Sequence, residues 1–215
     1  MAIITISREL GSGGGAITQM ILNSLKYQLV DKTLIERVMS QYGMVSFDKV
    51  YDSPHNIWSR YDNEYKELVK LLNKTIMAFA KYNNTLIVGR GGFVVLHDYR
   101  NVLNVLIRAP FDRRVRNAME TEGISDVITA ENTVKQNDHV RESFLQAFYG
   151  VGTDSAQMFD LVIDTSKVPL SMAGRWIMEA AQAIDQQMIK PEYNSLTAQV
   201  DSVLAKTIEE IYSTL

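Results

Sequence analysis

The chain has 215 residues, of which 46% are hydrophobic and 22% are charged, an ordinary composition for a globular protein with one sizeable core. Its net charge of -3 excludes the overall basic field that binds nucleic acid, and the lack of cysteine excludes disulfides and thiolate zinc sites. The chain start does not resemble a signal peptide, and no apolar run approaches the ~20 residues needed to cross a bilayer. We therefore expect a cytoplasmic protein without membrane contact.

The first feature along the chain is a short apolar run, Ile3–Ile6, followed by a glycine-rich loop at Gly11–Gly15 and a helical pattern. Ile17, Met20, Ile21 and Leu25 form the apolar stripe of that helix. Strand, glycine turn and helix in this order form the phosphate-cradling unit of nucleotide-binding α/β proteins. A flexible linker would also be glycine-rich, but linkers rarely separate a strand from its crossover helix. The loop is therefore predicted to bind phosphate through backbone N–H groups.

The glycine loop departs from the usual phosphate-binding pattern GxxxxGK[ST], because no lysine follows the glycines. Ala16, Ile17 and Thr18 come next. The cation that usually reaches the β- and γ-phosphates is missing, and Arg8 is the candidate replacement.

The next segment combines a short strand, 27–31, with a helix that Asp31 is predicted to cap, a role favoured over a catalytic one. Residues 43–63 are irregular and rich in aromatic side chains, and 64–82 read as a long helix. In a nucleotide kinase, an insert at 43–82 would bind the acceptor. Aromatic residues that merely cover the edge of the core would give the same pattern, and both interpretations stay open.

A second glycine turn, Gly89–Gly92, follows the apolar strand 85–88 and carries Arg90. Active sites of parallel sheets lie at the carboxyl ends of the strands. Arg90 is therefore placed to grip an anion with its planar fork, although a surface arginine in a tight turn is the alternative.

The segment after the strand 101–108 is basic and helical. A helix over 111–122 that ends at Gly123 carries Arg113, Arg114 and Arg116. A second helix is expected over 125–148, with Thr129 as its cap. Within it, Asp138 and Arg141 stand one turn apart and can share a face. These arginines either surround a phosphate chain or form a solvated face that pairs with Glu120 and Glu122.

The last strand is predicted at 159–166, and Ser171 is expected to cap the helix that follows it. Beyond Pro191 a polar segment leads into a final helical pattern at 200–211. This final helix either packs back on the domain or pairs with a second chain, so a homodimer through the C-terminal helix is one expectation.

Apolar strands that alternate with helices predict an α/β fold with a parallel sheet and helices on both faces. A glycine loop, a Gly-Arg-Gly turn and a basic lid suit phosphoryl transfer, which depends on positioning and on neutralising phosphate charge. A lid that closes over the phosphates would also exclude water.

The motifs resemble those of the cytidylate kinase-like family, a branch of the P-loop nucleoside monophosphate kinases. The resemblance covers about residues 2–185. It rests on six segments in order: Ile6–Gly14, Leu29–Ile35, Val88–Gly91, Ala109–Arg116, Asp138 with Arg141, and Phe159–Ser166.

This resemblance implies a three-layer P-loop kinase domain over residues 1–188, with an acceptor-binding insert at about 43–82, a helical lid at about 111–150 and a C-terminal helical extension at 189–215. It implies transfer of the ATP γ-phosphoryl group to CMP or dCMP with Mg²⁺, and no residue is predicted as a metal ligand. Gly11, Ser12, Gly13 and Gly14, with Gly15 and Arg8, would hold ATP. Arg90 would face the acceptor phosphate; the lid cations would be Arg113, Arg116 and Arg141, oriented by Asp138.

Two departures from the family pattern keep other functions open. Gly15 and Ala16 stand where many members carry arginine and glutamate, and Gly91 stands where typical cytidylate kinases carry aspartate. One alternative is a nucleotide- or phosphate-binding regulatory protein with impaired catalysis. Another is a kinase of a different small metabolite, whose acceptor is set by the insert around Trp58 and Tyr61.

Overall fold

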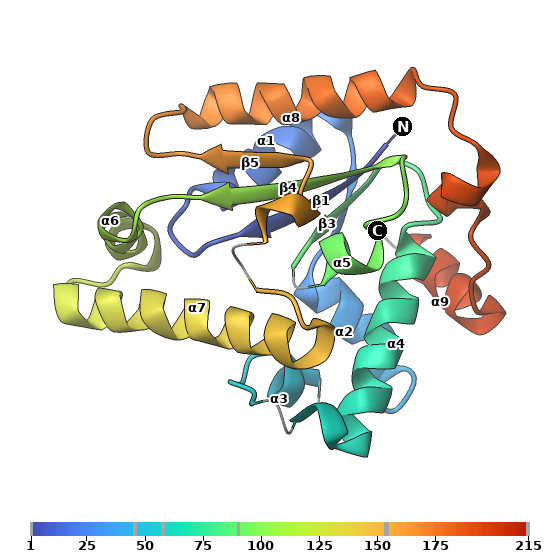
Figure 1. Cartoon of the computed structure of the whole chain (residues 1–215), viewed down its shortest axis with the longest axis horizontal. Helices are drawn as coiled ribbons and strands as arrows, with labels where there is room; N and C mark the ends of the chain where they lie inside the picture. The colour runs from blue at the N-terminus through green and yellow to red at the C-terminus, as the bar shows by residue number, and fades with distance from the viewer. Residues whose placement is uncertain (1, 45–46, 57–58, 90, 153–154, 214–215) are drawn as a thin grey trace.

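The computed structural model describes residues 2–44, 47–56, 59–89, 91–152 and 155–213. Five parallel strands form one sheet in the order β2-β3-β1-β4-β5 (Figure 1). Their bounds are β1 Ile3–Arg8, β2 Gln28–Val30, β3 Thr85–Val88, β4 Val102–Arg108 and β5 Leu161–Asp164. Because β1 lies at the centre, Ile3 packs into the core on one face, and Ile4 and Ile6 into the core on the other.

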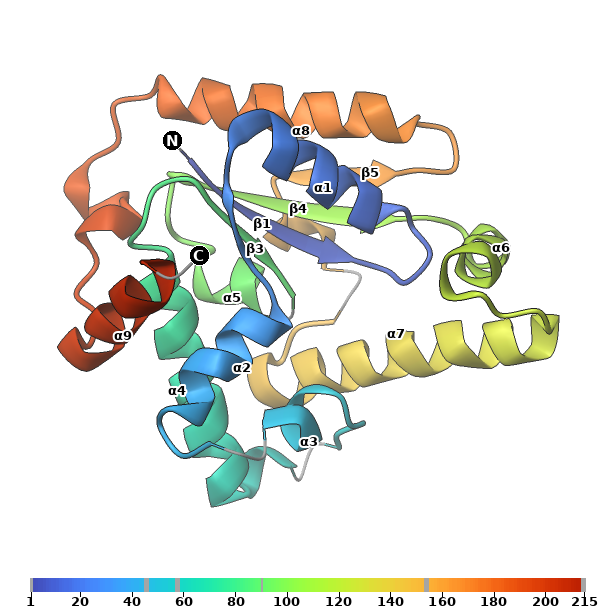
Figure 2. The ribbon, with the colours of Figure 1, turned by 180° about the vertical axis from the view of Figure 1, so that it is seen from behind.

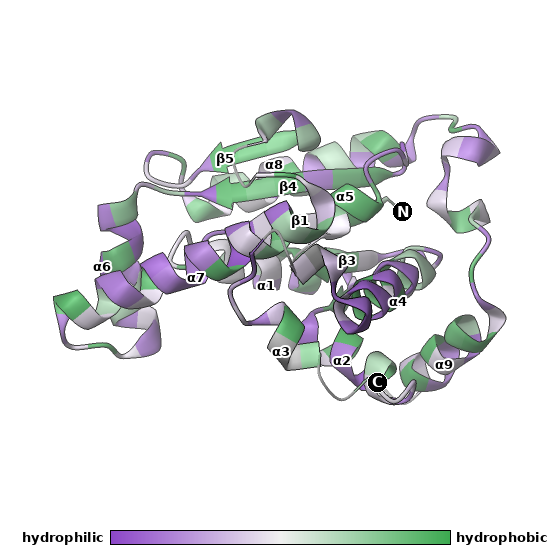
Figure 3. Ribbon diagram, turned by 60° about the horizontal axis from the view of Figure 1, so that its bottom comes forward, coloured by the Kyte–Doolittle hydropathy of each residue, from purple (hydrophilic) through white to green (hydrophobic). Residues whose placement is uncertain are grey.

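Helices cover both faces of the sheet, which confirms the predicted α/β fold (Figure 2). On one face lie α1 Gly14–Leu25 and α8 Leu170–Asp185. On the other lie α2 Lys32–Ser40, α4 Asn63–Phe79 and the short α5 Gly92–Val95. Figure 3 shows β4 and β5 largely in the hydrophobic colour, whereas α6 and α7 alternate in hydropathy. None of the helices in the described ranges is long and apolar enough to span a bilayer.

Two helices follow β4: α6 Phe111–Glu122 lies beyond the carboxyl ends of the strands, and α7 Val127–Tyr149 runs back from there below the sheet (Figure 1). Their contact has a small apolar core of its own, made by Val115, Ala118, Ala130 and Val134. These two helices fill the segment predicted as a helical lid and are called the lid helices below; that they close over a ligand stays a prediction. The left-handed Gly123, with φ 67°, ends α6 as expected.

The insert before β3 contains α3 Phe47–Tyr51, a 3₁₀ turn at Ser59–Tyr61 and α4. Its aromatic residues pack against the lid: Tyr51 contacts Phe144 of α7, with ring centroids 5.9 Å apart, and His55 contacts Phe148 at 4.9 Å. In the described part of the insert, the aromatics therefore both close the core and support the lid helix. Trp58 lies outside the described residues.

The helix caps correct two of the predicted boundaries. Asp31 caps α2 as expected, accepting a hydrogen bond from the Leu34 N–H at 3.0 Å. The cap of α7 is Asp126 rather than Thr129, because the Asp126 carboxylate accepts from both the N–H and the hydroxyl of Thr129. Ser171 lies inside α8, which begins one residue earlier.

The C-terminal extension packs back on the domain. After short 3₁₀ turns at Pro191–Tyr193 and Ser195–Thr197, it ends in α9 Ser202–Tyr212, whose apolar residues Leu204, Ile208 and Ile211 are buried against α2 and α4. The Ser195 hydroxyl donates to the Ala80 carbonyl, and the Asn101 amide binds Ser195. Because Asn101 precedes β4, the extension crosses the amino edge of the sheet. A homodimer through α9 stays a prediction, and it would have to use the outward face of this helix.

Candidate functional site

The glycine loop joins the end of β1 to the start of α1 and is packed too tightly for side chains. Gly11 and Gly13 have φ values of 78° and 79°, which favour glycine. A Cβ atom at Gly11 would lie 2.2 Å from the Arg114 carbonyl oxygen, and one at Gly13 would lie 2.7 Å from a methyl group of Leu170. The loop is therefore held between the first turns of α6 and α8.

Side chains around the loop bind its carbonyl groups. The Asn117 amide donates to the Gly11 carbonyl, and the Thr165 hydroxyl donates to the Ser12 carbonyl, both at 2.7 Å. Ser12 is fully buried and its own hydroxyl donates to the Glu9 carbonyl, so this side chain supports the turn. With these carbonyls engaged, the N–H groups of the first turn of α1, which have no partner within the helix, remain for an anion.

Two cavities meet at the carboxyl ends of the strands. The loop cavity, of about 550 Å³, is lined by the glycine loop, by α6 and by the turn before α8. The strand-end cavity, of about 270 Å³, is lined by the ends of β1 and β3, by the start of α2, by Tyr51 and by α7. Arg8 and Asn137 line both cavities, so these two side chains stand at the junction.

The strand-end cavity is basic. Arg8, Lys32 and Arg141 line it, with Asp31 as the carboxylate among its described lining residues. Lys32 also forms an ion pair of 2.5 Å with Asp52, which connects α2 to the insert. Arg141 is only 9% exposed and comes from the lid helix. This arrangement suits an anionic ligand whose charge replaces the water around the cations.

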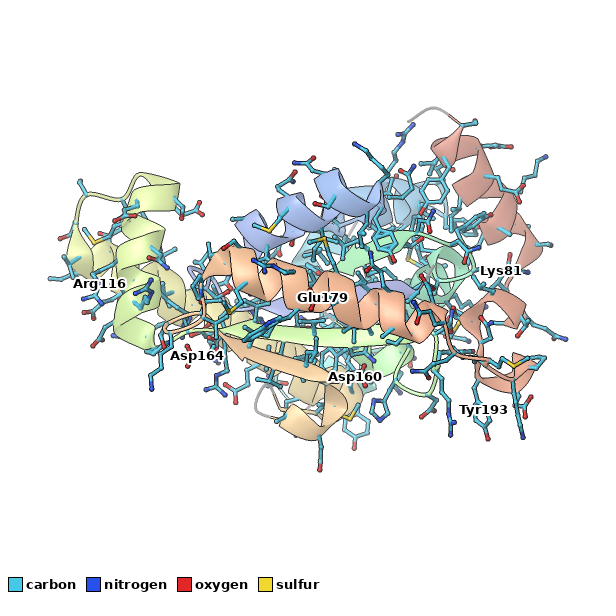
Figure 4. The ribbon with its side chains drawn as sticks, turned by 90° about the horizontal axis from the view of Figure 1, so that it is seen from above. Lys81, Arg116, Asp160, Asp164, Glu179 and Tyr193 are labelled. Carbon is cyan, nitrogen blue, oxygen red and sulfur yellow. The ribbon has the colours of Figure 1, made fainter. Side chains whose placement is uncertain are left out.

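The other arginines predicted as site residues do not share the surroundings of Arg141. Arg113 is exposed and lines the loop cavity. Arg116 is exposed and lines neither cavity; Figure 4 labels it on α6, at the end of the molecule remote from α9. Arg90 lies outside the described residues, although Gly89 lines the strand-end cavity.

Asp138 is paired with Arg114, one of the arginines predicted either to surround a phosphate chain or to form a solvated face, and Arg114 is buried rather than solvated. The Arg114 guanidinium, 6% exposed, donates to the two Asp138 carboxylate oxygens at 3.0 and 2.8 Å. Its Nε donates to the Ala109 carbonyl and lies 3.3 Å from the Glu9 carboxylate, which also accepts from the Ala109 N–H. Glu9, Arg114 and Asp138 thus tie the loop to both lid helices. The helical spacing of Arg114 with Val115 and Ala118 could have indicated its inward direction.

Two tyrosine hydroxyls pack closely against Gly89 and Gly91. A Cβ atom at Gly89 would lie 2.4 Å from the Tyr51 hydroxyl, and one at Gly91 would lie 2.5 Å from the Tyr149 hydroxyl. Tyr149 donates to the Asn73 side-chain carbonyl at 2.6 Å. Burial, reinforced by Tyr51, raises the pKa of Tyr149 well above its usual value. A neutral phenol therefore occupies the space into which a side chain at position 91 would extend.

Comparisons with known proteins agree with this architecture. The sequence profile of the cytidylate kinase-like family matches residues 3–167. A cytidylate kinase of Sulfolobus acidocaldarius is 26% identical over 166 residues, covering 76% of this chain and 85% of that protein. A cytidylate kinase of Pyrobaculum calidifontis is 22% identical over 172 residues, covering 80% and 88%.

The fold is also found in a solved structure. The crystal structure of an uncharacterized protein from Eubacterium ventriosum superimposes with a TM-score of 0.68 and 24% sequence identity, covering 85% of this chain and 98% of that one. Because the family profile spans the glycine loop, the insert, the lid and the last strand, the chain belongs to the cytidylate kinase-like family.

Proposed function

We propose that the protein transfers the γ-phosphoryl group of ATP to a nucleoside monophosphate, with CMP or dCMP as the expected acceptor. The observation that carries the proposal is the junction of a backbone phosphate cradle with a second, basic cavity through Arg8 and Asn137. Phosphoryl transfer requires donor and acceptor to meet in line with their charge neutralised. The archaeal relatives named cytidylate kinase support the choice of acceptor.

In this proposal ATP occupies the loop cavity. Its phosphates lie on the N–H groups at the start of α1, and Arg113 of α6 faces the same space. The loop backbone can approach the phosphates closely because it carries no side chains at Gly11, Gly13, Gly14 and Gly15, where a Cβ atom would collide with neighbouring atoms. The chain of phosphates then points toward Arg8 at the junction.

The acceptor phosphate occupies the strand-end cavity, where Lys32 and Arg141 neutralise it. One of its oxygens attacks the γ-phosphorus of ATP, and the bond from that phosphorus to the β–γ bridging oxygen breaks. The electron pair of the broken bond stays on ADP, and because the acceptor oxygen is already ionised at neutral pH, no proton has to leave it. Arg90 stays a predicted ligand of the same phosphate.

Magnesium is implied by the family, but the loop does not offer its usual hydroxyl ligand. Gly15 stands where the GxxxxGK[ST] pattern places serine or threonine, and the nearby Thr18 hydroxyl donates to the Gly14 carbonyl. Among the described residues, no group of three or more His, Asp or Glu side chains could hold a metal ion. The protein residues therefore do not fit a direct magnesium site of the usual kind.

A coupled assay of ADP formation tests the proposal. Purified protein is given ATP and Mg²⁺ with each of the common nucleoside monophosphates and with dCMP, and the acceptor-free rate serves as the blank. We expect turnover to be highest with CMP or dCMP. Rates equal to the blank with every acceptor would rule the kinase out.

The loop without lysine favours one second candidate, a nucleotide-binding protein that has lost catalysis. Thermal-shift titration separates it from the kinase. Stabilisation by ATP or CMP without turnover supports the binding protein, and the absence of any stabilisation by nucleotide or phosphate contradicts both functions.

A further inference from the structure

The Arg8 side chain runs across the start of α1. A Cβ atom built on Gly14 would lie 2.8 Å from the Arg8 Cβ and 2.9 Å from its Cδ, and one on Gly15 would lie 2.8 Å from Nη1. The aliphatic stem of Arg8 therefore covers Gly14, and its guanidinium reaches the position above Gly15. Any side chain at residue 14 would displace this arginine.

Residues 8 and 14 hold exchanged positions relative to the usual loop. When GxxxxGK[ST] is aligned on Gly13 as its second glycine, its first glycine falls on Arg8 and its lysine falls on Gly14. The usual loop thus has a small residue at the strand end and a cation at the helix start. In this chain the cation stands at the strand end, and the helix start is small enough for it to pass.

The charge of Arg8 is available to a ligand. Arg8 is exposed and forms no ion pair or hydrogen bond within the described chain. The adjacent Glu9 carboxylate is engaged by Arg114 and the Ala109 N–H. The start of α1 carries the positive end of its dipole, so an arginine beside it gains nothing until an anion lies between them.

We propose that Arg8 is the catalytic cation of this loop and contacts the γ-phosphoryl group as it passes from donor to acceptor. Arg8 lines both cavities, and its Nη1 lies over Gly15, at the start of the helix on which the phosphates are expected to lie. It stabilises the charge on the transferring group while the bond to the acceptor oxygen forms and the bond to the ADP oxygen breaks. Gly14 is a positioning residue, because its lack of a side chain lets Arg8 reach that group. This inference rests on the proposed kinase function.

A mutant cycle tests the coupling between the two positions. Arg8→Ala is expected to lower kcat by on the order of 10²-fold, the usual effect of removing one transition-state donor. Gly14→Ala is expected to lower kcat to a similar extent, because the methyl group displaces the Arg8 stem. In an Arg8→Gly background, which also lacks the Cβ atom that would lie 2.8 Å from the new methyl group, Gly14→Ala should have no further effect on kcat and should raise Tm, since alanine favours the helix. Arg175→Ala, an exposed arginine on α8, and Gly152→Ala, where a methyl group meets nothing within 4 Å, are the matched controls.

A transposed variant, Arg8→Gly with Gly14→Lys, restores the usual arrangement. Its kcat is expected to be at least tenfold higher than the kcat of Arg8→Ala. Wild-type kcat in Arg8→Ala, or additive losses for Arg8→Gly and Gly14→Ala, would overturn the inference. Calorimetric titration with ATP gives a measurement that needs no turnover. The substitutions at residues 8 and 14 should be non-additive in the Kd for ATP, as they are in kcat. If the wild type turns over no acceptor, the kinase proposal fails alone, while an additive cycle in Kd shows that Arg8 does not reach the nucleotide.

Discussion

The Arg114 guanidinium and the Asp138 carboxylate face each other in a two-bond pair, at 3.0 and 2.8 Å, that joins the first turn of α6 to the middle of α7. Arg114 reaches further, to the Ala109 carbonyl and to Glu9 at the start of the glycine loop. The lid helices are thus anchored to Glu9, at the start of the glycine loop. This relationship makes the pair a positioning device for the lid rather than a phosphate ligand.

Replacing Arg114 by alanine is expected to lower the free energy of unfolding by about 2–4 kcal/mol, because Asp138 and Glu9 lose the partner that offsets their charge. Urea unfolding followed by circular dichroism measures the loss. Arg116→Ala on the same helix, which removes an exposed arginine, should change stability by less than about 0.5 kcal/mol. Equal losses in the two variants would show that the buried pair does not hold the lid.

A comparison of Gly11 with Gly43 separates two costs of replacing glycine by alanine: the free energy of a left-handed backbone and the free energy of a steric collision. Their φ values are 78° and 77°, but a Cβ atom at Gly11 meets the Arg114 carbonyl at 2.2 Å, whereas one at Gly43 meets nothing within 4 Å. Gly43→Ala should therefore cost only the backbone term, about 1–2 kcal/mol. Gly11→Ala should cost a further 1–3 kcal/mol, since the loop and α6 must move apart.

The same pair of variants separates stability from nucleotide binding. Gly11→Ala should weaken ATP binding measured by calorimetry, because the cradle is displaced, and Gly43→Ala should leave the ATP affinity unchanged. Loss of ATP affinity in Gly43→Ala, or none in Gly11→Ala, would contradict the placement of the donor phosphates.

Strands and helix ends that depend on their own residues and nearest neighbours can be predicted from the sequence. Ile3 and Ile4 mark a strand buried on both faces, Asp31 caps a helix through its carboxylate, and Gly123 ends a helix because it has no side chain. Thr129 was wrong as a cap because Asp126, three residues earlier, offers a stronger acceptor that Thr129 itself binds.

Contacts between distant segments could not be predicted from the sequence. Helical spacing matches Asp138 with Arg141, but its partner in the structure is Arg114, which lies 24 residues away on another helix. No local pattern marks Lys32 or Asn137, because only the packing of α2 and α7 around the strand ends brings them to one cavity. The sequence likewise shows that the loop lacks its lysine, but it does not show that the Arg8 side chain lies across Gly14.

Lys32 provides a test of the acceptor cavity. Lys32→Met keeps the length of the side chain and removes the charge that faces the expected acceptor phosphate. We expect KM for the acceptor to rise on the order of tenfold, the equivalent of about 1.4 kcal/mol, with little change in KM for ATP. Steady-state rates with each substrate varied in turn measure both constants.

Lys206→Met, on the outward side of α9 and far from the strand ends, is the matched control for loss of a lysine charge. A rise confined to KM for ATP in Lys32→Met would place the two substrates the other way round.

The docking of α9 leads to a prediction for alkaline pH. The Tyr212 ring packs 5.8 Å from Phe79 and 5.3 Å from Tyr82, and burial raises its pKa to about 12. An unfolded chain releases this phenolic proton near pH 10. Between pH 10 and about 12 the unfolded state therefore binds fewer protons than the folded state, so stability falls as pH rises.

Tyr212→Phe removes this titration and should flatten the decline in the free energy of unfolding above pH 10, by on the order of 2 kcal/mol at most. Urea unfolding at pH 8 and pH 11.5, in the variant and the wild type, measures the difference, and other buried tyrosines cancel in it. Tyr61→Phe, at an exposed position, is the control for loss of a hydroxyl. An identical pH dependence in Tyr212→Phe and the wild type would mean that the phenol is solvated, and hence that α9 does not cover α4 in solution.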